Sequence, residues 1–258
     1  MRFDVITLFP ELFTPFLRAG VTRRAYESGL VDVHLSNPRE HATGNYRRVD
    51  DRPFGGGPGM LLMAEPLHAC LTAVRARRVI PAPVVLFSPV GQVLRHAAVQ
   101  RWASSEGAIL VCGRYEGVDQ RFIDSEVDEQ LSLGDFVLSG GELAAMALLD
   151  AVARLQPGVL TDDSGHAQDS FNPAIDGLLD APHFTRPEVW RGLAVPRPLL
   201  SGHHVQIERW RRDQRLLLSL THRPDLILQA RQSGRLSQRD EDCLAGLAGG
   251  AMAAVGAV

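Results

Sequence analysis

Three short apolar runs in this chain each end at a glycine-bearing loop, and the repeated pattern favours a parallel β-sheet. The runs are Val84 to Phe87, Ile109 to Cys112, and Phe136 to Leu138. Runs this short are typical of buried strands. Helical patterns alternate with them, the clearest beginning at Glu142 and running to about Leu155. We therefore predict an α/β fold with a mostly parallel sheet and helices packed on it.

The loops after these strands also predict a ligand site. Ligands of open α/β sheets bind beyond the carboxyl ends of the strands, and glycines let them approach bare backbone groups. Arg114, Tyr115, Glu116 and Asp135 lie between two of the glycine loops. The simpler interpretation is that the glycines only permit tight turns. With a pocket here, a side chain at Gly141 should block ligand binding and leave the fold intact.

Composition excludes several classes of enzyme. All 27 basic residues are arginine, whereas P-loop NTPases, pyridoxal enzymes and protein kinases each need a lysine. The three cysteines are far apart and form no C-x-x-C pair, which argues against a disulfide framework or a zinc cluster. No apolar run reaches about 18 residues, and the first residues do not resemble a signal peptide. A cytoplasmic location without membrane contact is expected.

Turn signals along the chain predict its domains. A breaker at Pro157-Gly158 precedes a polar, turn-rich stretch, and no strand pattern follows Ala174. We expect an α/β domain over 1–160, a flexible linker over 161–173, a helical domain over 174–247 and a disordered tail over 248–258. Upstream, 37–59 is a long polar loop with arginines and a glycine-rich end. It suits phosphate contact, with a solvated hinge as the alternative.

The expected helical domain is basic, although the whole chain has a net charge of −3. Ten arginines stand against four carboxylates between Ala181 and Arg235. This asymmetry predicts contact with a polyanion such as nucleic acid, and a solvated helix face is the alternative. Four of the arginines fall within two turns of one expected helix: Arg209, Arg211, Arg212 and Arg215.

Longer motifs point to a family. The chain carries DRPFGGGPGM, LVCGRYEGVD, SLGDFVLSGGE, RLQPGVL, DSF and PHFTRPEVW. Together they resemble the bacterial tRNA (guanine-N1)-methyltransferases over all of the chain except its tail. The resemblance implies a SPOUT-type trefoil-knotted, mostly parallel sheet with helices on both faces, and a small all-helical C-terminal domain. It also implies a homodimer with the active site at the subunit interface. The expected reaction moves the methyl group of S-adenosyl-L-methionine to N1 of guanosine 37 of tRNA, next to the anticodon.

The same resemblance assigns roles to residues. By it, Asp169 is the base that takes the N1 proton, and Arg154 is the cation that stabilises charge on guanine O6. Glu116 is a carboxylate near the site, and a magnesium ion at Glu116 and Asp169 is left open. Asp50 and Gly59 would contact tRNA together with the four arginines. The cofactor would be bound by Pro89, Gly113, Gly117, Ser132, Leu133, Gly134, Asp135, Phe136, Val137, Leu138, Gly140 and Gly141.

Three positions depart from the family pattern. Ala144 replaces a proline, Gly165 a serine, and Gln168 a glutamate that would lie beside Asp169. The last change removes a negative neighbour of the predicted base. The alternative to an enzyme is a catalytically inactive RNA-binding protein of the same fold, and the presence of all three predicted catalytic residues favours the enzyme. A nucleotide hydrolase that uses GGGPG as a phosphate loop is a weaker third interpretation, because no lysine is available.

Overall fold

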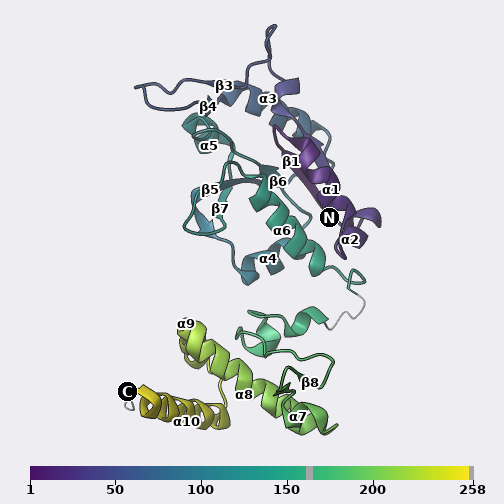
Figure 1. Ribbon diagram of the computed structural model, residues 1–258. Coiled ribbons are helices and arrows are strands. Elements are labelled where there is room, and N and C mark those ends of the chain that lie inside the picture. Colours follow the sequence, from purple (N-terminus) through teal and green to yellow (C-terminus); the bar gives the residue numbers. More distant parts are fainter. Residues whose placement is uncertain (161–164, 256–258) are drawn as a thin grey trace. The chain divides into compact units, whose positions relative to one another are not determined.

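The computed structural model describes residues 1–160 and 165–255, with side chains described up to residue 247. The chain divides into two compact units, Met1–Thr161 and Asp162–Val258. Figure 1 shows the elements of both units, and each unit is described by itself below.

A five-stranded parallel sheet forms the centre of the first unit (Figure 1). Its strands follow the order β2-β1-β6-β5-β7. Their bounds are β1 Arg2–Ile6, β2 Asp32–Ser36, β5 Val84–Val93, β6 Ile109–Val111 and β7 Glu129–Ser132. The mostly parallel sheet predicted from the apolar runs is therefore confirmed.

Alternating strand side chains build an apolar core on each face of the sheet. Val5 and Leu110 contribute to one core, whereas Ile6 and Val111 contribute to the other. The first core is covered by α1 Phe13–Arg18, α2 Arg23–Glu27, α4 His96–Ala103 and α6 Glu142–Arg154. The second is covered by α3 Ala64–Ala76 and α5 Gln120–Glu126. Short 3₁₀ turns, η1 Pro10–Leu12 and η2 Pro38–Glu40, connect these elements.

One predicted strand of this unit is wrong. Phe136–Leu138 is a loop, with Phe136 55% and Val137 83% exposed. The sheet instead uses β7, which lies at its edge and comes from the acidic stretch before that loop. Glu129 and Gln130 are half-buried in β7, so the strand carries no continuous apolar run for periodicity to detect. Helix α5 was also not foreseen. Only Phe122 is buried in this helix, so the helix carries little apolar pattern.

The second unit is mainly helical. It contains 3₁₀ turns η3 Gly165–Gln168 and η4 Pro173–Ile175, and helices α7 Arg197–Leu200, α8 His204–His222, α9 Pro224–Gln232 and α10 Gln238–Val255. Its small core includes Leu178, Leu216, Ile227 and Leu244. Among the described residues of both units, no helix has the length and apolarity that a membrane crossing requires.

Two features of the second unit differ from the sequence-based expectation. A hairpin of β8 Val189–Trp190 and β9 Leu193–Ala194 occurs where no strand was predicted. All four of its residues are exposed, so the hairpin has no buried face to produce an alternating pattern. Helix α10 also continues to Val255, through most of the expected tail, and residues 256–258 lie outside the described part of the chain.

Candidate functional site

A cavity of about 390 Å³ lies beside an irregular stretch of β5 and the loops that follow β6 and β7. This is the place at which open parallel sheets bind ligands. Ala144, one of the three departures, also lines it. Two predicted cofactor residues, Gly134 and Asp135, are not part of the lining. The other ten are: Pro89, Gly113, Gly117, Ser132, Leu133, Phe136, Val137, Leu138, Gly140 and Gly141.

A bulge in β5 makes one wall of this cavity. The pairing of β5 with β7 shifts register between Phe87 and Gln92, so the residues between them leave the ladder. Three of these residues, Ser88, Pro89 and Val90, line the cavity. The sequence signal for the bulge was the Ser-Pro-Val-Gly stretch, because proline cannot donate a ladder hydrogen bond.

Two glycine loops that line the cavity are joined to each other. The amide of Gly141 donates to the carbonyl of Gly113 at 2.9 Å, and Arg114 forms a β-bridge with Gly140. A Cβ on Gly141 would lie 2.8 Å from Cα of Cys112. This close approach argues against the expectation that a side chain at Gly141 leaves the fold intact, because the side chain would press on the backbone at the end of the strand.

A buried charge network supports these loops. Glu142, only 1% exposed at the start of α6, accepts hydrogen bonds from the Thr7 hydroxyl at 2.8 Å and from Nε of Arg114 at 3.1 Å. The Arg114 guanidinium also lies over the Phe9 ring. Burial, together with the nearby Glu142 charge, raises the pKa of the Cys112 thiol well above its ordinary value. Sequence reasoning gave no role to this network because its members are far apart in the chain.

The predicted tRNA contacts Asp50 and Gly59 lie on an arm beside the cavity. The arm is the hairpin of β3 Asp50–Asp51 and β4 Leu61–Leu62. It is attached where the Leu62 amide donates to the Gly117 carbonyl at 2.8 Å and the Glu116 amide donates to the Met60 carbonyl at 2.9 Å. Gly59 has φ +74°, and a Cβ there would overlap the Glu116 side chain. The fold thus places the arm next to a predicted catalytic carboxylate.

Arg154 is not brought to this cavity within its own unit. It is the last residue of α6, whereas the cavity borders the first turn of that helix. The helix has thirteen residues, so its two ends are roughly 18 Å apart at the rise of an α-helix. Asp169 lies in the second unit. The three predicted catalytic residues therefore do not meet at the cavity through the described contacts of one unit.

Hydrogen bonds hold Asp169 in a compact turn rather than in an extended connector. Its amide donates to the His166 carbonyl at 3.2 Å, and its carbonyl accepts from the Asn172 amide at 3.1 Å. Asn172 is buried, and its side chain donates to His166 and accepts from the Ala174 amide. The part of the expected linker from 165 to 173 is thus structured, while 161–164 lie outside the described residues.

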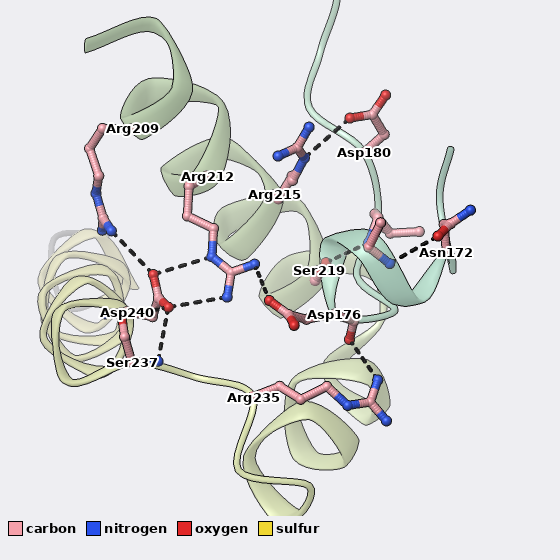
Figure 2. A network of polar contacts seen from close by, with 12 residues as sticks. Asn172, Asp176, Asp180, Arg209, Arg212, Arg215, Ser219, Arg235, Ser237 and Asp240 are labelled. Carbon is pink, nitrogen blue, oxygen red and sulfur yellow. Dashed lines mark hydrogen bonds and ion pairs between the residues drawn. The ribbon is translucent and has the colours of Figure 1, made fainter. Parts of the chain in front are cut away.

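The arginines of α8 are largely engaged inside the second unit (Figure 2). Arg209 pairs with Asp213 and Asp240, and Arg212 pairs with Asp176 at 2.8 Å and Asp240 at 3.1 Å. The Arg215 side chain is 7% exposed and contacts Asp180 at 3.3 Å. Only Arg211, 37% exposed and paired with Glu208 on the surface, is well placed to meet phosphate. Clustering in sequence therefore did not distinguish a binding surface from an internal network.

Asp240 is the centre of that network. Its residue is 4% exposed. Burial alone would raise the pKa of this carboxyl, but hydrogen bonds from Arg212 and from both the side chain and the backbone of Ser237 outweigh burial. They hold the pKa well below its ordinary value. The ionised form of Asp240 is therefore part of the folded unit.

Comparisons with known proteins match most of the chain to one family of proteins. A model of the family described as tRNA (Guanine-1)-methyltransferase TrmD matches residues 1–229. The chain is 72% identical to the tRNA (guanine-N(1)-)-methyltransferase of Albidiferax ferrireducens over 95% of its length and 99% of the relative. It is 69% identical to the protein of the same name in Paracidovorax citrulli, over 96% of this chain and 99% of the relative.

Proposed function

The chain belongs to the tRNA (guanine-1)-methyltransferase family, and we propose that it moves the methyl group of S-adenosyl-L-methionine to N1 of guanosine 37 of tRNA. The observation that carries the proposal is the cavity beyond the strand ends, with its glycine loops and with the β3–β4 arm attached at Glu116 and Gly117. Gln130 lines this cavity and keeps its Oε1 buried without a hydrogen-bond partner. A polar group of this kind, among apolar walls, fits a nucleoside-containing cofactor.

The cofactor, when bound, supplies an electrophilic methyl group, and the protein must make guanine N1 nucleophilic. N1 carries a proton, so a base must remove it. We assign this step to Asp169. Proton removal places charge on O6, and we assign Arg154 to stabilise that charge. Among the described residues of one chain, no three His, Cys, Asp or Glu side chains gather to hold a metal ion.

A homodimer would reconcile the assigned roles with the distances. Arg154 lies at the far end of α6 from the cavity of its own unit. A second copy could supply Arg154 and Asp169 to that cavity, which places each active site at the subunit interface. Exposed apolar side chains near the cavity support this arrangement, since Val90, Val137 and Leu143 are 81%, 83% and 59% exposed. A trefoil knot in the sheet and a cytoplasmic location are also part of the proposal.

We propose that exposed arginines of the second unit bind the tRNA backbone. Arg186, Arg191, Arg197 and Arg211 lie on its surface. Reversing the charge of Arg186 and Arg197 should weaken tRNA binding. The slope of log affinity against log salt should fall by about 0.9 for each phosphate that the protein no longer neutralises. Cofactor affinity should not change.

One assay tests the reaction itself. The full chain is incubated with labelled S-adenosyl-L-methionine and either a tRNA transcript with guanosine at position 37 or the same transcript with adenosine there. Label should appear at N1 of guanine in the first transcript only. If the protein binds cofactor and tRNA in separate measurements but transfers no label, it is the inactive RNA-binding protein of the alternative interpretation.

A further inference from the structure

Helix α8 binds the segment from Gln168 to Asp180, which carries Asp169. The Arg215 guanidinium reaches two parts of this segment: Nη2 donates to Oε1 of Gln168 at 3.3 Å, and Nε donates to Oδ1 of Asp180 at 3.3 Å. One turn further along α8, the Ser219 hydroxyl accepts from the Leu179 amide at 2.9 Å. Figure 2 shows Arg215 and Asp180 facing each other across this helix surface.

The two parts of the segment are also tied to each other. The Asp180 amide donates to the Ser170 hydroxyl at 2.9 Å, and the Phe171 amide donates to the Leu178 carbonyl at 2.8 Å. Asp169 therefore sits between Gln168, which Arg215 binds, and Ser170, which Asp180 binds. A shift of Arg215 would be transmitted to Asp169 from both sides.

We propose that Arg215 is a positioning residue that fixes the place of Asp169 by binding Gln168 and Asp180 at once. The inference rests on the proposed function, in which Asp169 is the base. A base must lie within hydrogen-bond reach of the proton that it removes, so a displaced carboxylate loses rate even when substrates still bind. Gln168 serves this role without a negative charge beside Asp169, which the glutamate of the family pattern would add.

Variants of Gln168 separate positioning from folding. Gln168 is exposed, whereas Arg215 is buried and its loss also removes the guanidinium that pairs with Asp180. The test is single-turnover methyl transfer by the full chain at saturating cofactor and tRNA. It compares the parent with Gln168→Ala, Gln168→Glu, Arg215→Gln and the double variant Gln168→Ala/Arg215→Gln. Arg231→Gln is the matched control, because Arg231 forms an exposed pair with Glu241 in the same unit.

Gln168→Ala should slow transfer roughly tenfold, with cofactor and tRNA affinities unchanged. The double variant should be no slower than Arg215→Gln alone, because both changes remove the same hydrogen bond. Gln168→Glu keeps a partner for Arg215 and should stay within about twofold of the parent. Arg231→Gln should react at the parent rate.

Gln168→Ala at the parent rate, or losses that add in the double variant, would overturn the inference. Asp169→Asn, measured alongside, keeps this outcome distinct from failure of the proposed function. If Asp169→Asn abolishes transfer and Gln168→Ala does not slow it, only the positioning role falls. If Asp169→Asn reacts at the parent rate, the assignment of the base falls, and the positioning role falls with it.

Discussion

At the scale of single residues, the groups proposed to do chemistry differ from the groups that hold the cavity wall in place. Asp169 and Glu116 are side chains of structured turns whose backbone is fixed by hydrogen bonds. Gly141 and Glu142 instead hold the cavity wall in place through backbone contact and buried charge. Substitutions of the two kinds should therefore have different signatures, one in the rate of transfer and the other in stability.

Replacement of Asp169 by asparagine should lower methyl transfer by at least about a hundredfold, because the amide cannot accept the N1 proton. Affinities for cofactor and tRNA should change little, since the loss occurs only in the transition state. Single-turnover rates and separate binding titrations check both statements. A variant that binds both substrates and transfers at the parent rate would show that another group is the base.

Replacement of Gly141 by valine should destabilise the first unit by roughly 3 kcal/mol, because the branched side chain would be forced against the backbone of Cys112. Thermal unfolding followed by circular dichroism measures the loss. Gly158→Ala is the comparison, because a Cβ on Gly158 meets no atom within 4 Å, although its φ of +77° carries a cost of its own. A Gly141→Val protein as stable as the parent would contradict the close approach.

At the scale of elements, α8 is a structural helix as much as a binding one. Its buried face carries Arg212 and Arg215, which connect it to α10 and to the segment of Asp169. Replacing Arg212 by glutamine should cost about 3 kcal/mol of stability, since Asp240 and Asp176 lose their shared cation in a partly buried place. The same substitution at exposed Arg231 should cost much less stability, because solvent screens its pair with Glu241. Equal losses in chemical denaturation would argue against a structural network.

The Asp240 network should also make the second unit sensitive to acid. The pKa of the Asp240 carboxyl is lower in the folded state than the value of about 3.9 expected for the unfolded chain. The stability that it contributes is therefore fully present above pH 4 or so, and is lost as the pH falls toward the folded pKa. Unfolding of Asp240→Asn and of the parent should differ most near neutrality and converge in strong acid. A difference that is constant with pH would show that the carboxylate charge contributes nothing.

At the scale of the whole molecule, the proposed active site needs two chains. Arg154 and Asp169 would come from one subunit and the cavity from its partner. Co-expression of an Asp169→Asn chain with a chain whose cavity is filled by Leu138→Arg should restore roughly a quarter of the parent activity, because about half the dimers are mixed and each has one intact site. Either variant alone should be inactive. No recovery in verified mixed dimers would place each site within a single chain.

The sequence by itself determined the features that depend on local pattern. Apolar runs predicted β5 and β6, because burial of a strand leaves its mark on consecutive residues, and glycine loops after them predicted the cavity. The motifs pointed to the family and to its expected site residues. What periodicity detects is burial, so it missed β7, whose half-buried Glu129 and Gln130 lie at the edge of the sheet.

Only the tertiary structure decided what the charged residues do. Arg212 and Asp240 are 28 positions apart, and no local pattern says that one neutralises the other. The four arginines of α8 look alike in sequence, yet burial beside carboxylates gives three of them structural partners and leaves Arg211 on the surface. The physical reason is that neighbours in space decide whether a charged side chain pairs inside the fold or faces solvent. Folding brings those neighbours together from distant parts of the chain.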